Sequence, residues 1–111
     1  MYFYFYDKLT QDKKYEPLLI KVETRLIDLG LNGRVEKLSI FKNAREIIRD
    51  AVKKGAKTII AVGDDKTFST VVNMVATHDV TLGFIPVEQG VFSRLLGMPT
   101  GEAACDVLSK R

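Results

Sequence analysis

The sequence is poor in the residues from which disulfides, cysteine-based metal sites and histidine catalysis are built. It has one cysteine, one histidine and no tryptophan in 111 residues. Cys105 alone excludes an intrachain disulfide and a cysteine-rich metal site, which favours a reducing, cytoplasmic setting. Its neighbours Ala104 and Leu108 predict that it is a small core residue of the last helix. His78 lies in a polar stretch before a predicted strand, so we interpret it as a surface residue rather than a catalytic base.

A long hydrophobic run and a strong excess of one charge are also absent. The aromatic run Tyr2–Tyr6 meets Asp7 and Lys8 too soon to be a signal peptide or a membrane span. The 17 Lys and Arg residues against 14 Asp and Glu give a net charge of +3, and they are scattered, so no nucleic-acid partner is predicted. With 46% hydrophobic residues, the chain is expected to form one globular domain over residues 1–111.

Continuous apolar runs predict the strands. A strand in a parallel sheet covered on both faces meets no water, so its sequence is apolar throughout rather than alternating. Three segments have this character, and a fourth is more polar, which places it nearer a sheet edge. The three are Tyr2–Tyr6, Thr58–Val62 and Val80–Ile85, and the fourth is Arg34–Leu38.

Helical spacing of apolar residues separates these strands. The first predicted helix has Pro17 in its first turn and stops at Gly30, and Asn43 is expected to cap a second that stops at Gly55. A third follows Thr67, a short apolar one surrounds residues 91–96, and Thr100 is expected to cap the last. Strands alternating with helices predict an α/β fold, a three-layer αβα, Rossmann-like domain with a mostly parallel sheet of four or more strands.

The carboxyl ends of the strands are where such a sheet binds ligands. The loops expected there are residues 7–15, 39–43, 63–67 and 86–90. The loop at residues 63–67 combines a glycine, two carboxylates, an ammonium and a hydroxyl at a helix N-terminus. Backbone N–H groups at such a position attract phosphate. An aspartate there can hold Mg²⁺ or act as a base, and Lys66 can offset developing charge. The alternative is that Asp64 and Asp65 simply cap the helix.

Two stretches resemble the signatures of one enzyme family. Residues 63–73 read GDDKTFSTVVN, which is similar to the GGDGTLNEVVN motif of diacylglycerol kinase-like lipid kinases, a superfamily shared with sphingosine kinases and NAD kinases. Residues 82–99 read LGFIPVEQGVFSRLLGMP, which resembles the family's second loop, LGIIPLGTGNDFARTLGIP. The two motifs occur in the family's order, and the resemblance is good from Gly55 to Leu108.

The resemblance implies the N-terminal, nucleotide-binding domain of an ATP-dependent phosphotransferase that acts on a lipid or another hydroxyl acceptor. Mg²⁺ and ATP are the implied ligands, and a lipid substrate at a membrane surface is an implied partner. Asp65 matches the motif aspartate and is the implied catalytic and metal residue. The implied nucleotide-binding residues are Gly63, Asp64, Lys66, Thr67, Glu88, Gln89 and Gly90.

The sequence departs from the family pattern in both loops. Asp64 and Lys66 replace glycines that let the backbone approach phosphate, and Glu88 and Gln89 replace a Gly-Thr pair. The family's β-rich second domain, which closes the ATP cleft, is not expected in this chain, so catalysis by the chain alone is not predicted. The alternative function is a noncatalytic binding or assembly domain, either self-associating or docking on a second domain. A further alternative is an unrelated flavodoxin-like domain.

Overall fold

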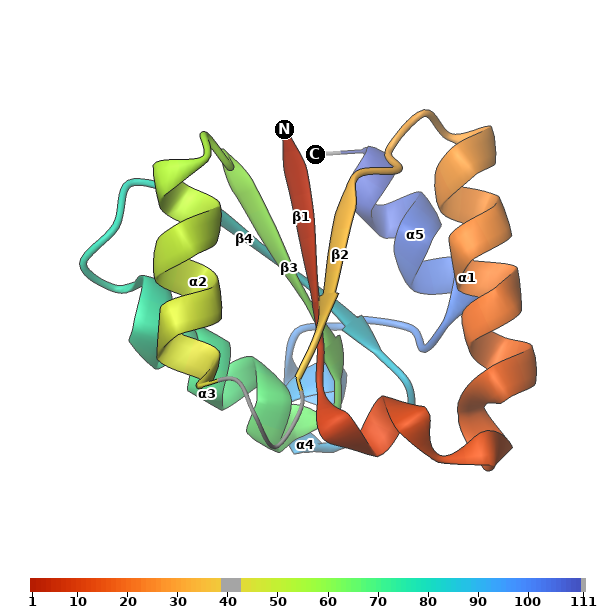
Figure 1. Ribbon diagram of the computed structural model, residues 1–111. Helices are drawn as coiled ribbons and strands as arrows, with labels where there is room; N and C mark the ends of the chain where they lie inside the picture. The colour runs from red at the N-terminus through yellow and green to blue at the C-terminus, as the bar shows by residue number, and fades with distance from the viewer. Residues whose placement is uncertain (39–42, 111) are drawn as a thin grey trace.

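The computed structural model describes residues 1–38 and 43–110. Four parallel strands form one sheet in the order β2-β1-β3-β4. This confirms the predicted parallel α/β sheet. The more polar strand predicted over Arg34–Leu38 does lie at an edge of the sheet, as β2 (Figure 1). The strands are β1 (Tyr2–Tyr6), β2 (Arg34–Lys37), β3 (Thr58–Gly63) and β4 (Thr81–Pro86).

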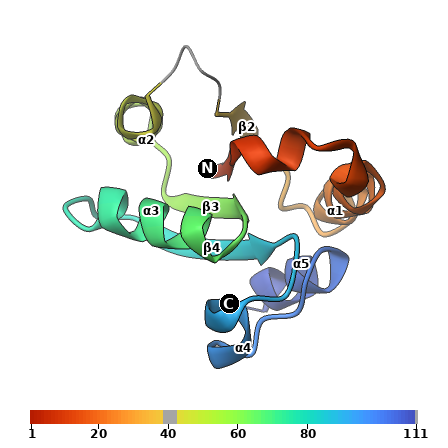
Figure 2. The same cartoon turned by 90° about the horizontal axis from the view of Figure 1, so that it is seen from below.

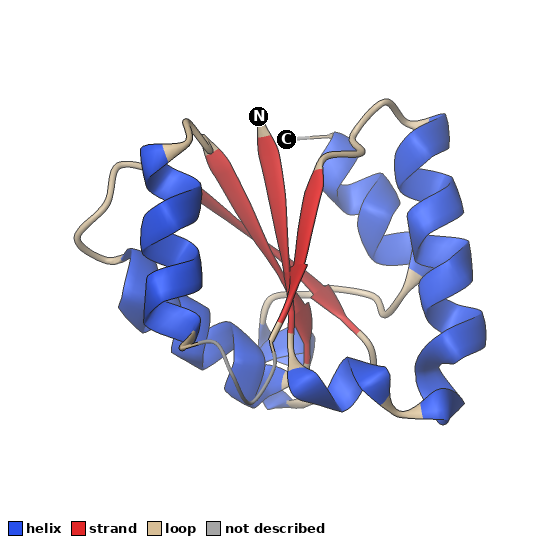
Figure 3. Ribbon diagram, viewed as in Figure 1, coloured by secondary structure: helices blue, strands red, loops and turns tan. Residues whose placement is uncertain are grey.

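Helices cover both faces of the sheet, as predicted. Helices α1 (Glu16–Asp28) and α5 (Glu102–Ser109) pack on one face, and α2 (Ala44–Lys53) and α3 (Asp65–Val75) pack on the other (Figures 1 and 3). The short helix α4 (Val91–Leu95) follows β4. None of the described helices is long and apolar enough to cross a membrane.

The aromatic strand β1 supplies side chains to both halves of the core. Tyr4 and Tyr6 point to the α1/α5 face, and Phe3 and Phe5 point to the α2/α3 face. All four are at most 2% exposed, so the prediction of a strand buried on both sides is confirmed. The phenols keep partners inside the protein, because Tyr4 donates to the Leu31 carbonyl and Tyr6 donates to Glu23 Oε1 at 3.0 Å. Burying them therefore leaves no polar group unpaired.

Most predicted helix boundaries are confirmed, and one is wrong. Pro17 lies in the first turn of α1, and the Asn43 side chain caps α2 by accepting from the Arg45 N–H at 2.8 Å. Thr100 does not cap α5. Gly101 is the N-cap, with φ of +57°, and its N–H donates to the Pro86 carbonyl at 2.8 Å. The turn needs a backbone conformation that glycine adopts readily and threonine does not.

The segment after β1, predicted as a loop, forms two short 3₁₀ helices. These are η1 (Lys8–Gln11) and η2 (Lys13–Tyr15). Asp7 Oδ1 accepts from the Lys8 N–H at 2.5 Å, and Asp12 Oδ1 accepts from the Lys14 N–H at 3.0 Å. Each turn therefore begins at an aspartate whose carboxylate satisfies a free N–H group.

Cys105 is buried, as predicted, and burial raises its pKa to about 11.

Candidate functional site at the carboxyl ends of the strands

The strand order creates a crevice at a defined place. The chain runs from β1 outward to β2 and then crosses to β3 on the opposite side of β1, so the order reverses between β1 and β3. In parallel α/β sheets, ligands bind beyond the carboxyl ends of the strands at this switch point. The segments after β1, β3 and β4 gather at that end of the molecule (Figure 2). The second predicted loop, residues 39–43, lies outside the described residues except for Asn43.

Asp64 occupies the N-terminus of α3. Its Oδ1 accepts from the Thr67 N–H at 3.0 Å, and its own N–H donates to Thr67 Oγ1 at 3.2 Å, which makes a reciprocal cap. Asp64 therefore caps α3, as the capping alternative predicted for it. A carboxylate here is favoured by the helix dipole and takes up one of the N–H groups at the helix N-terminus.

Thr67 is the centre of a buried polar cluster. It is 1% exposed, and its hydroxyl donates to Asp7 Oδ2 and lies 3.0 Å from Asp64 Oδ1. The hydroxyl thus joins the end of β1 to the start of α3. Gly63, also buried, makes room for it, because a Cβ at Gly63 would overlap the Thr67 side chain.

Asp65 links the loop after β3 to the loop after β4. Its Oδ2 accepts from the Val91 N–H at 2.6 Å. The carboxylate also lies against Gly90, where an added Cβ would meet it at 2.5 Å. Of the residues predicted together with it, Lys66 is exposed to solvent.

The loop after β4 is held by its own side chains. Gln89 Nε2 and the Gly90 N–H both donate to Ser93 Oγ, at 3.1 and 2.8 Å. Ser93 is fully buried and was not among the predicted site residues. The sequence does contain a signal for this role of Ser93. A serine three residues after a loop glycine is typical of a hydroxyl that accepts from backbone N–H groups of the loop. Glu88 is exposed and accepts from the Tyr15 hydroxyl at 2.9 Å.

A hollow of about 520 Å³ lies between these loops. It brings together the segments after β1, β3 and β4, with two ammonium groups and three carboxylates in its lining. Burial, followed by the hydrogen bond to Glu88, raises the pKa of Tyr15, so the phenol stays protonated and donates to that carboxylate. The lining residues are Lys8, Leu9, Asp12, Lys14, Tyr15, Asp64 and Glu88.

The structure unites the predicted residues only in part. Asp64 and Glu88 line the hollow, and Gly63 and Thr67 are buried beside Asp64. The other predicted site residues are not part of its lining; these are Asp65, Lys66, Gln89 and Gly90. Lys8 and Lys14 also line the hollow and were not among the predicted site residues. Their signal is a group of lysines in the segment after the first strand, but lysines on a solvated surface are so common that this signal is weak.

Among the described residues, protein side chains alone do not form a metal site. Within residues 1–38 and 43–110, no three His, Cys, Asp or Glu side chains gather closely enough to hold an ion. Mg²⁺ in phosphoryl-transfer sites is held by one or two carboxylates together with substrate phosphates and waters. The carboxylates that line the hollow, Asp12, Asp64 and Glu88, are donors of the kind used in that mode.

Comparison with known proteins decides the family. The model of the diacylglycerol kinase catalytic domain matches residues 2–111. The chain belongs to this family. The resemblance predicted from residues 63–73 and 82–99 is therefore confirmed, and it extends over almost the whole chain. No curated protein matches the sequence.

Solved structures show the same fold. One is described as a "putative diacylglycerol kinase" from Bacillus anthracis str. Sterne, with a TM-score of 0.75 and 18% identity over 99% of this chain. Another structure, of the same description and organism, has a TM-score of 0.70 and 19% identity over 98% of this chain. The matches cover 39% and 40% of those two chains. The family domain described here therefore corresponds to about two fifths of their length.

Proposed function

We propose that this chain is the ATP-binding half of a diacylglycerol kinase-type phosphotransferase whose acceptor is a lipid hydroxyl or another hydroxyl. The observation that carries the proposal is the hollow at the switch point, where the segments after β1 and β3 bring Lys8 and Lys14 beside the start of α3. Two exposed ammonium groups next to a helix N-terminus suit the phosphates of a nucleotide. The single, buried cysteine suits a cytoplasmic protein.

Several residues at this end of the sheet have distinct parts in this proposal. Lys8 and Lys14 bind phosphate oxygens, and the exposed Lys66 offsets the negative charge of the phosphates. Asp65 holds Mg²⁺ with those phosphates or takes the proton of the acceptor hydroxyl. Gly63 and Thr67 act indirectly, by fixing the turn that presents Asp64 and Asp65. A second domain, of the extent seen in the longer matched chains, would complete the cleft and bring the acceptor.

Removing the two lysines should weaken nucleotide binding. We expect the double variant Lys8→Ala, Lys14→Ala to raise the Kd for Mg-ATP about tenfold, because each exposed ion pair contributes about 0.7 kcal/mol. Isothermal titration calorimetry measures this directly. Lys57→Ala is the matched control, because Lys57 is an exposed lysine just before β3, at the opposite end of the sheet. Equal affinity of the double variant and the control would contradict the assignment of the hollow.

A specific observation favours the noncatalytic alternative. The Asp64 carboxylate fills the helix N-terminus where the family signature has glycine, and it adds a negative charge beside the place of the phosphates. A domain that no longer needs phosphate tolerates such a cap. In that case the fold serves as a binding or assembly module.

Neutralising Asp64 separates the two functions. Asparagine caps a helix about as well as aspartate, so Asp64→Asn should fold normally. We expect it to bind Mg-ATP about tenfold more tightly than the parent chain, because a unit charge beside the phosphates is removed. Asp79→Asn, an exposed site before β4, is the control. Absence of nucleotide binding in the parent and in Asp64→Asn alike would leave the assembly module as the function.

A further inference from the structure

Tyr15 contacts two oppositely charged side chains of the hollow. It is the last residue of η2, and it lines the hollow together with Lys14 and Glu88. Its ring packs in the core on the α1/α5 face, and the residue is only 8% exposed. Its phenol donates to Glu88 Oε2 at 2.9 Å. The ring is therefore fixed both by packing and by a bond to the loop after β4.

The Lys14 ammonium lies over this fixed ring. Lys14 Nζ is 5.0 Å from the centroid of the Tyr15 ring, which is within the range of a cation–π interaction. The backbone of the same lysine is held as well, because Asp12 Oδ1 accepts from the Lys14 N–H at 3.0 Å. A side chain held at both ends has less conformational freedom left to lose when a ligand binds it, and this favours binding.

The contact with the ring positions the ammonium without neutralising it. No described carboxylate forms an ion pair with Lys14, although Asp12, Asp64 and Glu88 line the same hollow. The face of an aromatic ring attracts a cation through its quadrupole and carries no net charge. The positive charge of Lys14 is therefore available to an anionic ligand in the hollow.

The hydroxyl of Tyr15 engages the carboxylate of Glu88. Burial, followed by the hydrogen bond to Glu88, raises the pKa of Tyr15, and the nearby Lys14 ammonium opposes this rise. The phenol thus stays protonated at neutral pH, and it donates to an oxygen of Glu88 that is not paired with Lys14. One residue therefore orients both charged side chains and keeps them from forming an ion pair with each other.

We propose that Tyr15 is a positioning residue of the hollow, whose ring holds the Lys14 ammonium in place for the phosphates of a nucleotide. This role rests on the nucleotide site proposed above. Tyr15 acts only through Lys14, so removing the ring and removing the ammonium should have the same effect on nucleotide affinity, and the two effects should not add.

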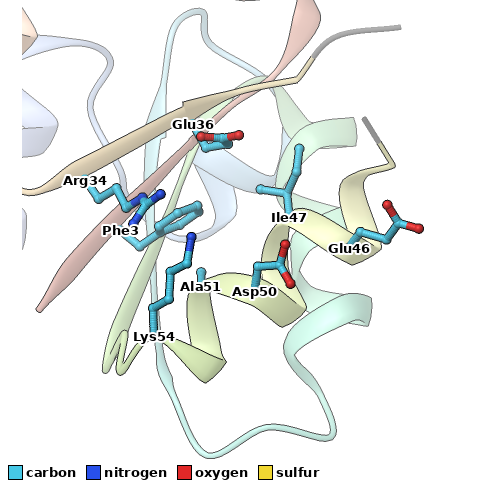
Figure 4. A pocket seen from close by; sticks show the side chains of 8 residues that line it. All are labelled: Phe3, Arg34, Glu36, Glu46, Ile47, Asp50, Ala51 and Lys54. Carbon is cyan, nitrogen blue, oxygen red and sulfur yellow. The ribbon is translucent and has the colours of Figure 1, made fainter. Parts of the chain in front are cut away.

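Calorimetric titration with Mg-ATP tests the role of the ring. Tyr15→Leu should raise the Kd about threefold, the share expected of Lys14 alone, and should have no further effect in a Lys14→Ala background. Tyr15→Phe keeps the ring and should bind within about twofold of the parent. Lys54→Ala is the matched control and should bind like the parent. Lys54 is also exposed, but it lines a separate pocket of about 200 Å³ between β2 and α2, which it shares with Phe3 (Figure 4).

Side-chain NMR of the ligand-free protein measures the contact itself. The ring current of an aromatic ring shifts the signals of groups above its face upfield. The Hε signals of Lys14 should therefore lie upfield of those of a solvated lysine. This shift should remain in Tyr15→Phe and disappear in Tyr15→Leu, and it does not depend on any nucleotide.

The two measurements distinguish failure of this role from failure of the nucleotide site. Equal affinities of the parent and Tyr15→Leu, additive losses in the double variant, or unshifted Lys14 signals in the parent would overturn the role of Tyr15 alone. A parent chain that does not bind Mg-ATP would overturn both. Thermal melts confirm that each variant is folded, and if Tyr15→Leu unfolds, the Lys14 signals of the parent and of Tyr15→Phe decide the outcome.

Discussion

Raising the pH from 8 to 11 should lower the free energy of unfolding by roughly 5 kcal/mol. Three buried acids cause this loss. Burial raises the pKa of the Cys105 thiol to about 11 from 9.0, and it raises the pKa of Tyr4 and of Tyr6 far above 10.0. For Tyr6, the charge and hydrogen bond of Glu23 add to the effect of burial. A change of this size would remove most of the stability of an ordinary small domain.

The direction follows from proton binding. The raised pKa values mean that the folded protein keeps protons that the unfolded chain releases at alkaline pH. The stabilisation that these groups contribute is therefore fully present below pH 9 and falls as each group ionises in the unfolded chain. The contribution of Cys105 stops changing above pH 11, where the thiol also ionises in the folded protein. At pH 11, Cys105 accounts for about 2 kcal/mol of the lost free energy of unfolding, and each tyrosine accounts for about 1.4 kcal/mol.

Urea unfolding at several pH values measures this loss. Tyr6→Phe should reduce the loss between pH 8 and 11 by about 1.4 kcal/mol, whatever it does to stability at pH 8. The quantity to compare is the change in the free energy of unfolding with pH in the parent and in Tyr6→Phe. This comparison cancels the loss of the hydrogen bond to Glu23, which lowers the stability of the variant at every pH. A pH dependence that is the same in parent and variant would show that Tyr6 does not stay protonated in the folded protein.

Gly63→Ala should destabilise the protein by about 2–3 kcal/mol. The new methyl group would overlap the Thr67 side chain, which cannot move aside because it is tied to Asp7 and Asp64. Gly30→Ala is the control. Its Cβ meets nothing within 4 Å, so it bears only the strain of a positive φ, about 1 kcal/mol. Urea midpoints compare the two variants, and equal losses would mean that the turn relaxes without strain at Gly63.

The sheet was predictable because its strands have an unmistakable composition. Tyr2–Tyr6 and Thr58–Val62 are apolar throughout, which is typical of a strand covered on both faces. The polar run beginning at Arg34 was equally informative, since an edge strand meets solvent. Local capping chemistry located the start of α2 at Asn43, because its side chain bonds to the adjacent turn.

Features that depend on backbone conformation were harder to predict. At the start of α5, Thr100 looks like the better cap, but a φ of +57° at Gly101 decides the turn. The segment after β1 lacks any periodic pattern, and its 3₁₀ turns depend on single bonds from Asp7 and Asp12. Such short elements have no apolar stripe that would reveal them in a sequence.

The location of the site was predictable, but its internal connections were not. The motif placed Gly63, Asp64 and Asp65 at a helix N-terminus, and the structure shows them there. The bonds that define the site join residues distant in sequence, such as Thr67 to Asp7 and Val91 to Asp65. These contacts depend on which strands become neighbours. The strand order could not be derived from the sequence.

The substitutions in the two loops now have a physical description. Side chains fill positions that glycine leaves open in the family signature, and the fold uses them. Asp64 caps α3, and Glu88 ties the loop after β4 to the segment after β1 by accepting from the Tyr15 hydroxyl. The family glycines give access to phosphate, whereas these residues give the turn added support. The balance between access and support determines whether the domain still binds a nucleotide.

The most direct test of the central claim is a titration with Mg-ATP followed by amide chemical shifts. We expect saturable shifts in residues 8–15 and 63–67, which line or support the switch-point hollow, and none around Lys57 at the amino ends of the strands. Binding confined to those segments would support a retained nucleotide site. An absence of shifts at millimolar Mg-ATP, or shifts spread over the surface, would contradict it.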